Sequence, residues 1–463
     1  MHKHHPLRLA LATATTAALT GGLLTFAAAT PATAATGQYA ADFNGDGYKD
    51  AVAAATQARV GGMWWAGAVG IAYGSSSGVG RTASVSQNTT GVPGAAEDYD
   101  AFGEAVAVGD LNKDGYSDLV VGAPYESVGD DEQAGAVVIV WGSSTGLKGA
   151  TTVKDPAPTK HDRWGQALAV GDFTGDGKPD LAVGATGTTQ WIIKGGFTKS
   201  GTTGAKITYT TTWTGSGGVR RLVSGKVDTD AKADLVIGGR TRLSSENDLD
   251  HNYLYFGTTS APTKQRQLPY GTQLTVADLN KDGYGDVVTG WTQTATGGTM
   301  AGNGPATVSY LTSSGVSSTL QLPWPGIPSV GDINGDGHKD LALGDPDDST
   351  EAGVAGAVHL HYGAAAGPTA DAAVTLTQNS AGVPGSAETN DFFGESTLLT
   401  DLNKDGKADL LTAANGENGF DGLVTLLKGS ASGITTSGAK TYGPTAFGIS
   451  TGDDPRLGMI MAG

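Results

Sequence analysis

The sequence predicts an all-β fold: a seven-bladed β-propeller in which each blade is a four-stranded antiparallel sheet. Three observations support this prediction. A nine-residue acidic string recurs in seven copies at intervals of roughly 50 to 70 residues, a period that suits four short strands and their loops. Short runs rich in Val, Ala and Leu flank the copies, and Gly, a residue of tight turns, makes up 73 of the 463 residues.

Each repeat contains the same strand signals in the same order. In the second repeat the first strand is "FGEAVAVGD", and the acidic string that starts at its last Asp forms the loop to the second strand, "DLVVGAP". The third and fourth strands are "GAVVIVWG" and "TTVKDPA". Because successive strands run in opposite directions, the acidic loops share one face with the turns after the third strand. The long loops after the second strand lie on the opposite face.

The acidic strings predict calcium-binding hairpin loops. Six copies follow the pattern D-x-N-x-D-G-x-x-D, with Thr174 in place of Asn in one of them. Oxygen atoms from positions 1, 3, 5 and 9, with the carbonyl of position 7, can converge on one ion, and Gly at position 6 permits the sharp turn. All-oxygen ligation favours Ca²⁺ over Zn²⁺. A metal-free turn rich in Asp and Gly would explain one copy but not six in the same register.

The predicted ligands of the six calcium ions are Asp42, Asn44, Asp46, Tyr48, Asp50, Asp110, Asn112, Asp114, Tyr116, Asp118, Asp172, Thr174, Asp176, Lys178, Asp180, Asp278, Asn280, Asp282, Tyr284, Asp286, Asp332, Asn334, Asp336, His338, Asp340, Asp401, Asn403, Asp405, Lys407 and Asp409. The seventh copy, Lys226 to Asp234, has Lys226 at position 1 and Ala231 at position 6. We expect this copy to be metal-free, with the ammonium group of Lys226 in place of the ion.

Composition and charge exclude several classes of protein. The chain has 46 acidic and 29 basic residues, a net charge of −17 that argues against nucleic acid and anionic lipid as partners. It contains no Cys, so neither disulfides nor a thiolate site can rigidify the fold. Packing or a bound hard cation must therefore rigidify the fold. We also expect the protein to be a monomer.

The amino terminus has the pattern of a secretory signal. Residues 1–34 comprise a short basic region, an apolar run rich in Ala and Thr, and small residues at Ala32 to Ala34. A membrane anchor is the alternative, but no stop-transfer flank follows, and no later run is apolar for long enough to span a bilayer. We therefore expect a secreted, extracellular protein with one propeller over residues 35–463.

The carboxyl-terminal residues 453–463, "DDPRLGMIMAG", resemble a first strand without its calcium loop. Since little chain precedes Asp42 to form that strand, we expect residues 453–463 to dock beside residues 50–55 and close the ring, which leaves no open sheet edge. The alternative is a frayed tail.

Three further patterns suggest functional sites. Trp64 and Trp65, in "GGMWWAG", can stack on a sugar ring or plug a blade interface. "GSSSG" at 74–78 and "GSSTG" at 142–146 match the nucleophile elbow G-x-S-x-G, but both follow a third strand and so are expected to be turns. His359 and His361 share one face of a strand, where they can bind a metal, act as a base or form a solvated or inter-blade pair.

The string "AFGEAVAVGDLNKDGYSDLVVGAP" resembles the FG-GAP repeats of the integrin α-subunit propeller. The FG element is matched at Phe102 and at Phe393, with Trp164 as a variant, and the GAP element is complete at Gly122 to Pro124. The chain is also similar to secreted FG-GAP proteins of filamentous actinobacteria. This resemblance implies a propeller and bound calcium, and it does not imply the partners of integrins.

These observations favour an extracellular binding or adhesion module for a protein or a polysaccharide over an enzyme. One alternative is a secreted hydrolase or polysaccharide lyase on a propeller scaffold, which would need Lys, Arg, His or Tyr clustered beside a metal. Another is a purely structural scaffold at the cell surface.

Overall fold

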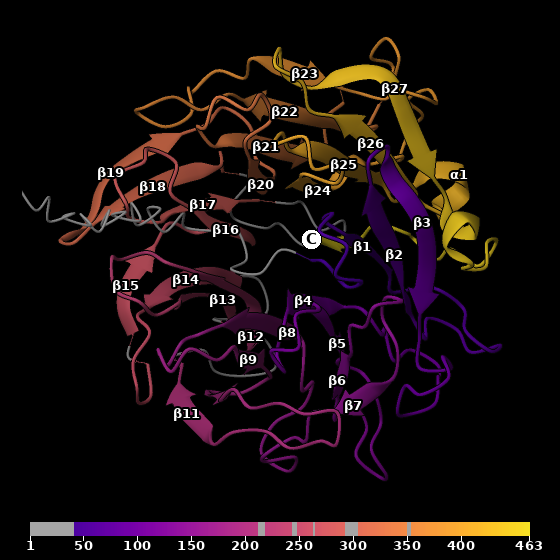
Figure 1. The fold of residues 1–463 in the computed structure, drawn as a ribbon, viewed down its shortest axis with the longest axis vertical. Coiled ribbons are helices and arrows are strands. Elements are labelled where there is room, and N and C mark those ends of the chain that lie inside the picture. The colour runs from indigo at the N-terminus through magenta and orange to yellow at the C-terminus, as the bar shows by residue number, and fades with distance from the viewer. Residues whose placement is uncertain (1–40, 212–217, 243–247, 263, 292–303, 350–352) are drawn as a thin grey trace, which may run out of the picture. The chain divides into compact units, whose positions relative to one another are not determined.

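The computed structural model describes residues 41–211, 218–242, 248–262, 264–291, 304–349 and 353–463. The predicted signal, residues 1–34, lies outside these residues. Within them the chain forms seven sheets, each of four antiparallel strands, which confirms the seven-bladed propeller (Figure 1). Among the described residues, no helix is long and apolar enough to cross a membrane.

The blades follow the chain in order, and each sheet takes four successive strands except the first. Their strands are β28 (Ile460–Ala462), β1 (Ala51–Ala55), β2 (Ala68–Ser75) and β3 (Gly78–Val85); β4 (Ala105–Gly109), β5 (Asp118–Ala123), β6 (Ala136–Val140) and β7 (Ala150–Thr152); β8 (Ala167–Gly171), β9 (Asp180–Gly184), β10 (Thr189–Ile193) and β11 (Lys206–Thr210); β12 (Val219–Gly225), β13 (Asp234–Arg242), β14 (Asp248–Tyr255) and β15 (Lys264–Leu268); β16 (Gln273–Ala277), β17 (Asp286–Gly290), β18 (Thr307–Thr312) and β19 (Gly315–Gln321); β20 (Ile327–Gly331), β21 (Asp340–Asp345), β22 (Ala357–His361) and β23 (Val374–Leu376); β24 (Phe393–Thr400), β25 (Asp409–Ala414), β26 (Leu423–Lys428) and β27 (Thr435–Tyr442).

The first strands of neighbouring blades contact one another around the ring. β28 contacts β4, and the contacts continue through β8, β12, β16, β20 and β24 back to β28. These strands lie nearest the centre in Figure 1. The only helical segments in the described part of the chain are one turn each, α1 (Glu417–Phe420) and the 3₁₀ turn η1 (Pro444–Phe447).

The first blade combines residues from both ends of the described chain. Strand β28 pairs antiparallel with β1, with Ile460 opposite Ala54 and Ala462 opposite Val52. Gly458, two residues before Ile460, donates its N–H to the carbonyl of Ala54 at 2.9 Å. The ring is thus closed by hydrogen bonds between strands that are far apart in the sequence.

The core lies between the sheets, where apolar side chains of adjacent blades meet. Val52 and Ile71 of the first blade pack with Val121 of the second in one buried cluster. The aromatic residues of the FG elements are fully buried in these layers: Phe102, Trp164 and Phe393. Trp164 therefore fills the same position as the two phenylalanines, as the sequence comparison of the repeats predicts.

Both G-x-S-x-G matches are hairpin turns between the third and fourth strands of a blade. The hydroxyl of Ser75 donates to the carbonyl of Gly78 at 2.8 Å, and Ser143 donates to Gly146 at 2.6 Å. The middle serine of each match is exposed. Ser75 and Ser143 therefore close hairpin turns. Among the described residues, neither match lies at a strand-to-helix elbow.

Candidate functional site

The acidic loops lead into the second strand of each blade and fold around their own carboxylates. In the loop that starts at Asp110, the carboxylate of Asp110 accepts the N–H groups of Asp114 at 3.0 Å and Gly115 at 2.8 Å. The side-chain oxygen of Asn112 also accepts the N–H of Asp114, at 2.9 Å. The loops at Asp42, Asp278 and Asp401 repeat this pattern, so these acids are drawn together by the backbone despite their charge.

The aspartate at position 9 is buried and joins the loop to the rest of the blade. Asp118 accepts the N–H of Leu111 at 2.9 Å with one oxygen and the N–H of Gly142, after the third strand, at 2.9 Å with the other. In the seventh blade Asp409 accepts only the N–H of Gly429, and its buried Oδ2 has no hydrogen-bond partner in the structure.

The charge on these loops favours a bound cation. Burial raises the pKa of Asp118 to about 7, and the carboxylates of Asp110 and Asp114 act in the same direction. Burial raises the pKa of Asp50 and Asp286 to about 7 as well. A divalent cation held by the loop would offset this concentration of negative charge, so the residues fit Ca²⁺ in both ligand type and charge. The assignment of each ligand stays a prediction.

The fourth blade, which carries the degenerate copy, has a lysine paired with its acidic loop. The ammonium group of Lys232, at position 7, pairs with Asp230 at 2.5 Å. No ion pair of Lys226 occurs among the described contacts, so the expectation that Lys226 supplies the counter-charge is wrong. Asp234 still accepts the N–H groups of Val227 and Gly257, both at 2.9 Å. The buried aspartate at position 9 therefore keeps both of its backbone hydrogen bonds in a blade whose acidic loop is incomplete.

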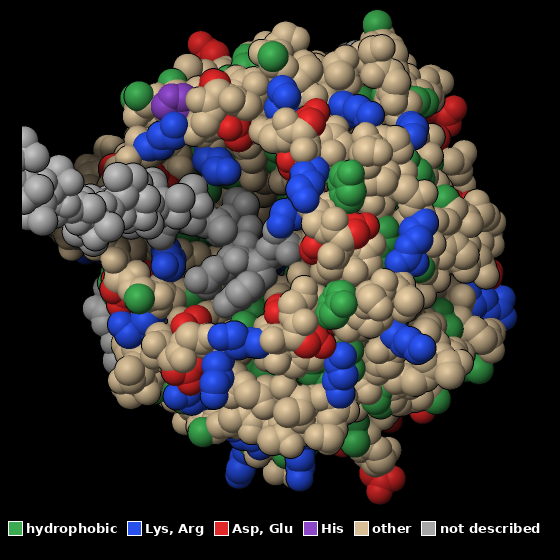
Figure 2. All heavy atoms as spheres, viewed as in Figure 1, with side chains coloured by type: hydrophobic (Ala, Val, Ile, Leu, Met, Phe, Trp, Pro, Cys, Tyr) green, Lys and Arg blue, Asp and Glu red, His purple; other side chains and the backbone are tan. Residues whose placement is uncertain are grey.

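Lysine side chains connect neighbouring loops. Lys113 of the second blade donates to the carbonyl of Gly177 in the third at 2.9 Å, and Lys199 reaches back to Asp114 at 2.9 Å. On the face shown in Figure 2, Lys and Arg side chains are interspersed with Asp and Glu.

An aromatic patch, formed by Met63, Trp64, Trp65 and Tyr99, lies on the long-loop side of the first blade. Trp64 and Trp65 are 45% and 44% exposed and Tyr99 is 60% exposed, so neither tryptophan plugs a blade interface. Trp65 packs edge-on against Tyr99 with ring centroids 5.7 Å apart. The guanidinium group of Arg59 lies 4.5 Å from the Trp64 ring.

Backbone hydrogen bonds hold the aromatic patch in place. Tyr99, in the segment that leads to the second blade, donates its N–H to the carbonyl of Trp64 at 2.8 Å. The carboxylate of Asp98 accepts the N–H of Trp64 at 2.6 Å. Trp65 and Tyr99 both have positive φ, 52° and 74°. Two loops from different parts of the repeat thus fix three aromatic rings at the surface.

His359 and His361 form an inter-blade pair. Both are buried and lie against Trp324, which precedes the sixth blade: the Trp324 ring stacks on His359 at 4.4 Å and meets His361 edge-on at 5.8 Å.

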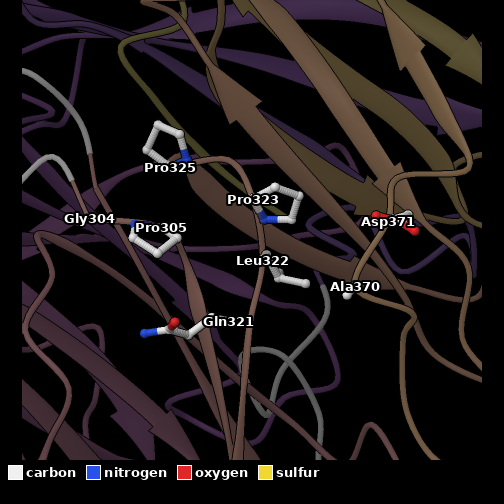
Figure 3. A pocket seen from close by; sticks show the side chains of 8 residues that line it. All are labelled: Gly304, Pro305, Gln321, Leu322, Pro323, Pro325, Ala370 and Asp371. Carbon is white, nitrogen blue, oxygen red and sulfur yellow. The ribbon is translucent and has the colours of Figure 1, made fainter.

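A groove of about 490 Å³ lies near this pair, between the segment after β19 and the segment before β23. Proline rings and Leu322 form one side, with Asp371 on the facing segment (Figure 3). Among the described residues that line the groove, Asp371 is the one ionisable side chain.

Comparison with known proteins agrees with the fold. The family described as "FG-GAP repeat" matches residues 102–140, 164–203, 324–361 and 393–427, which fall in the second, third, sixth and seventh blades. The mouse integrin alpha-IIb is 38% identical over 98 residues, or 20% of this chain and 9% of its own. Integrin alpha pat-2 of Caenorhabditis briggsae is 42% identical over 95 residues, covering 19% of this chain and 8% of its own.

A second group of relatives are enzymes. The human phosphatidylinositol-glycan-specific phospholipase D is 34% identical over 163 residues, which are 30% of this chain and 19% of that protein. The chain therefore spans less than a fifth of the length of these relatives. Together with the seven four-stranded blades, these similarities show that the chain is a β-propeller that contains FG-GAP repeats, and that these repeats are homologous to those of the integrin α subunits.

Proposed function

We propose that this protein is a secreted, calcium-stabilised binding module whose aromatic patch recognises an extracellular polysaccharide or protein. The observation that carries the proposal is the exposure of Trp64, Trp65 and Tyr99 on loops opposite the calcium loops. Large rings that stay at the surface lose the free energy of burial, so their retention is better explained by a partner that covers them.

The fixed geometry of the patch supports this role. Aromatic side chains have few rotatable bonds, and those of the patch are already held by the neighbouring backbone, so little conformational entropy is lost when a ligand binds. Trp, Tyr and Arg are also the residues that most often dominate binding energy at interfaces, and Arg59 adjoins the patch. A sugar ring can stack on an indole face, while a protein can place an apolar side chain between Trp64 and Tyr99.

Calcium has a structural role in this proposal. The six predicted loops lie on the other side of the propeller from the patch, so an ion there cannot contact a ligand at Trp64. Removing calcium is therefore expected to weaken binding only through loss of the fold. The integrin relatives and the phospholipase relatives share only these repeats with the chain, so their own partners and substrates are not transferred to it.

The experiment compares binding by the parent protein and by Trp64→Ala, Trp65→Ala and Tyr99→Ala variants, on a glycan array and on immobilised extracellular proteins, with calcium in excess. We expect each variant to lose roughly tenfold or more in affinity. Tyr270→Ala is the matched control, because Tyr270 is 46% exposed and lies outside the patch. Equal loss in the control, or unchanged binding by all three patch variants, would contradict the proposal.

The same samples test the enzyme alternative. Bound polysaccharides are analysed for shortened or unsaturated products. Release of such products by the parent protein would show that the protein is a hydrolase or lyase, and the proposal of a binding module would be replaced.

A further inference from the structure

Two positions in the sixth blade differ together from their equivalents in the second blade. In the second blade Ala123 ends the second strand and Val138 lies in the third, and both are buried in an apolar cluster. The residues at the same places in the sixth blade are Asp345 and His359, which are also buried, at 7% and 2% exposed. A carboxylate and an imidazole thus replace two apolar side chains at a buried place, where ionisable groups are costly unless they bind something.

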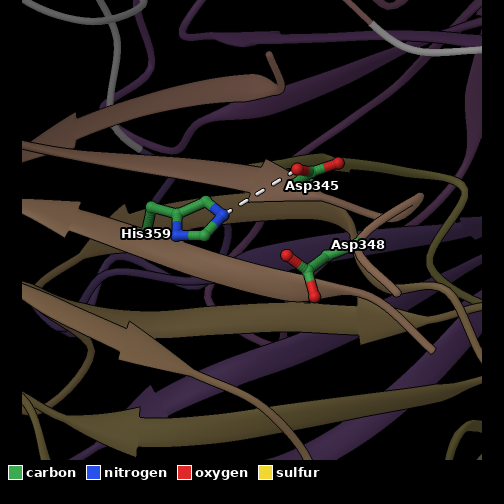
Figure 4. Close-up of side chains that lie close together, drawn as sticks. All are labelled: Asp345, Asp348 and His359. Carbon is green, nitrogen blue, oxygen red and sulfur yellow. Dashed lines mark ion pairs between the residues drawn. The ribbon is translucent and has the colours of Figure 1, made fainter. Parts of the chain in front are cut away.

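A third ligand group comes from the loop that follows. Asp345, Asp348 and His359 each place one oxygen or nitrogen within 4.8 Å of the others. The shortest printed distance is 3.8 Å, from Asp345 Oδ2 to His359 Nε2, and Figure 4 shows Asp348 alongside this pair. The N–H groups of Ala355 and Gly356 donate to the carbonyl of Asp348 at 3.1 and 2.9 Å, which ties Asp348 to the residues that lead into β22.

The imidazole of His359 is oriented for coordination. Its Nδ1 lies 3.1 Å from the hydroxyl of Thr375, and its ring stacks on Trp324, so the ring position is fixed on two sides. Its Nε2 faces Asp345 and has no hydrogen-bond partner, although the residue is 98% buried. A metal-binding histidine is commonly held in this way, with one nitrogen hydrogen-bonded and the other directed at the ion.

We propose that Asp345, Asp348 and His359 bind a divalent transition-metal ion, with Zn²⁺ as the probe. An imidazole with two carboxylates suits Zn²⁺ and its first-row neighbours, whereas Ca²⁺ prefers oxygen ligands alone. Ligand atoms bonded to one Zn²⁺ lie about 3.4 Å apart. The Asp345–His359 pair, at 3.8 Å, needs only a small closure, and Asp348 has to approach from within 4.8 Å. Three protein ligands leave one position for water or for a donor atom of a ligand, so this site differs in metal and in geometry from the calcium loops.

The test is isothermal titration of Zn²⁺ into the full chain, with Ca²⁺ kept in excess so that the acidic loops are saturated. We expect the parent protein to bind one more Zn²⁺ than the His359→Asn and Asp345→Asn variants, or to bind it at least roughly tenfold more tightly. His361→Asn is the matched control. His361 lies two residues away on the same strand, is buried and contacts the same Trp324, but does not belong to the three-residue group.

A spectroscopic measurement keeps the test independent of stability. Co²⁺ bound to nitrogen and oxygen ligands absorbs visible light, and this absorption is expected in the parent and in His361→Asn but not in His359→Asn. If His359→Asn does not fold, Asp345→Asn and Asp348→Asn retain the side-chain shape and remove the charge. Unchanged Zn²⁺ stoichiometry and affinity in these variants, or no Zn²⁺ binding by the parent at micromolar concentration, would show that Asp345 and His359 form only an ion pair.

Discussion

The carboxylate of Asp234 accepts a hydrogen bond from the backbone N–H of Gly257, at 2.9 Å, in the one blade whose acidic loop lacks its first aspartate. The same carboxylate accepts the N–H of Val227. Asp118 makes the equivalent pair of bonds in a blade with a complete loop. The aspartate at position 9 therefore has a role in the blade itself, separate from its predicted role as a calcium ligand.

We predict that Asp234→Ala destabilises the protein by about 2–4 kcal/mol, because two buried N–H groups lose a charged acceptor. The loss in the free energy of unfolding, measured by denaturant titration, should be the same with calcium and with chelator. Asp230→Ala, which removes a half-exposed carboxylate from the same loop, is the control and should cost less than 1 kcal/mol. A cost for Asp234→Ala that appears only in calcium would contradict this interpretation.

Calcium removal should destabilise the propeller. Extracellular calcium modules bind at roughly 10⁻⁴ to 10⁻³ M, and a site whose Kd is tenfold below the free calcium adds about 1.4 kcal/mol by mass action. Excess EGTA is therefore expected to lower the Tm clearly. Asp282→Ala, in a complete loop, should cost more than Lys226→Ala, and most of that difference should vanish in EGTA. A melt that EGTA leaves unchanged would rule out structural calcium.

The pairing of β28 with β1 should be essential for stability. Deleting residues 453–463 exposes the edge of β1, and we expect aggregation or a large fall in Tm. A finer test uses Gly458, whose φ is 94° and where an added Cβ would lie 2.3 Å from the Cβ of Ala413. Gly452 has a similar φ of 84° with open space around it, so Gly452→Ala measures the backbone strain alone.

Gly452→Ala should cost about 1–2 kcal/mol, and Gly458→Ala should cost clearly more because the close contact is added to the strain. Equal costs for the two variants, or a truncated protein that melts like the parent, would mean that the closing strand contributes little.

Stability should also depend on the protonation of Glu126. Burial raises its pKa to about 7, and the charge of Asp100 acts in the same direction; burial raises the pKa of Asp100 to about 6. A carboxyl with a raised pKa binds more protons in the folded than in the unfolded state between about pH 4.5 and 7. This pair therefore favours folding at low pH, and its contribution is lost as the pH rises through about 7.

Glu126→Gln should raise the Tm at pH 8 and flatten the difference in Tm between pH 5.5 and pH 8, with calcium in excess at both. The side chain of Gln87 donates to Glu126 and can still do so in the variant. A variant with the same pH profile as the parent would show that Glu126 is not the group that titrates.

The fold could be predicted from the sequence because the signal is repeated. A single copy of "GDLNKDGYSDLVVG" leaves a strand and a turn uncertain, but seven copies in one register fix the number of strands, their order and the faces of the loops. The burial of Trp164 in the place of Phe102 follows from the same comparison. Local departures from the repeat could be seen too, since Asp345 stands where Ala123 stands in the second blade.

The details of the sites could not be predicted, because they depend on contacts between repeats. The counter-charge to Asp230 comes from Lys232 and not from Lys226, since the direction of a long side chain depends on its neighbours in space. The exposure of Trp65 depends on its packing against Tyr99 from the next linker. The proximity of Asp348 to His359 depends on backbone hydrogen bonds that tie Asp348 to Ala355 and Gly356, and residue spacing does not encode those contacts.

The closure of the first blade by β28 has a consequence for how the protein is made. Strand β1 emerges from the ribosome roughly 400 residues before its partner, and pairings so distant in sequence form slowly. The six later sheets can each form from contiguous chain, but the first stays incomplete until β28 has been made. Order of synthesis and order of folding therefore differ, and the newly made chain must keep an unpaired edge from associating with other molecules until its last strand arrives.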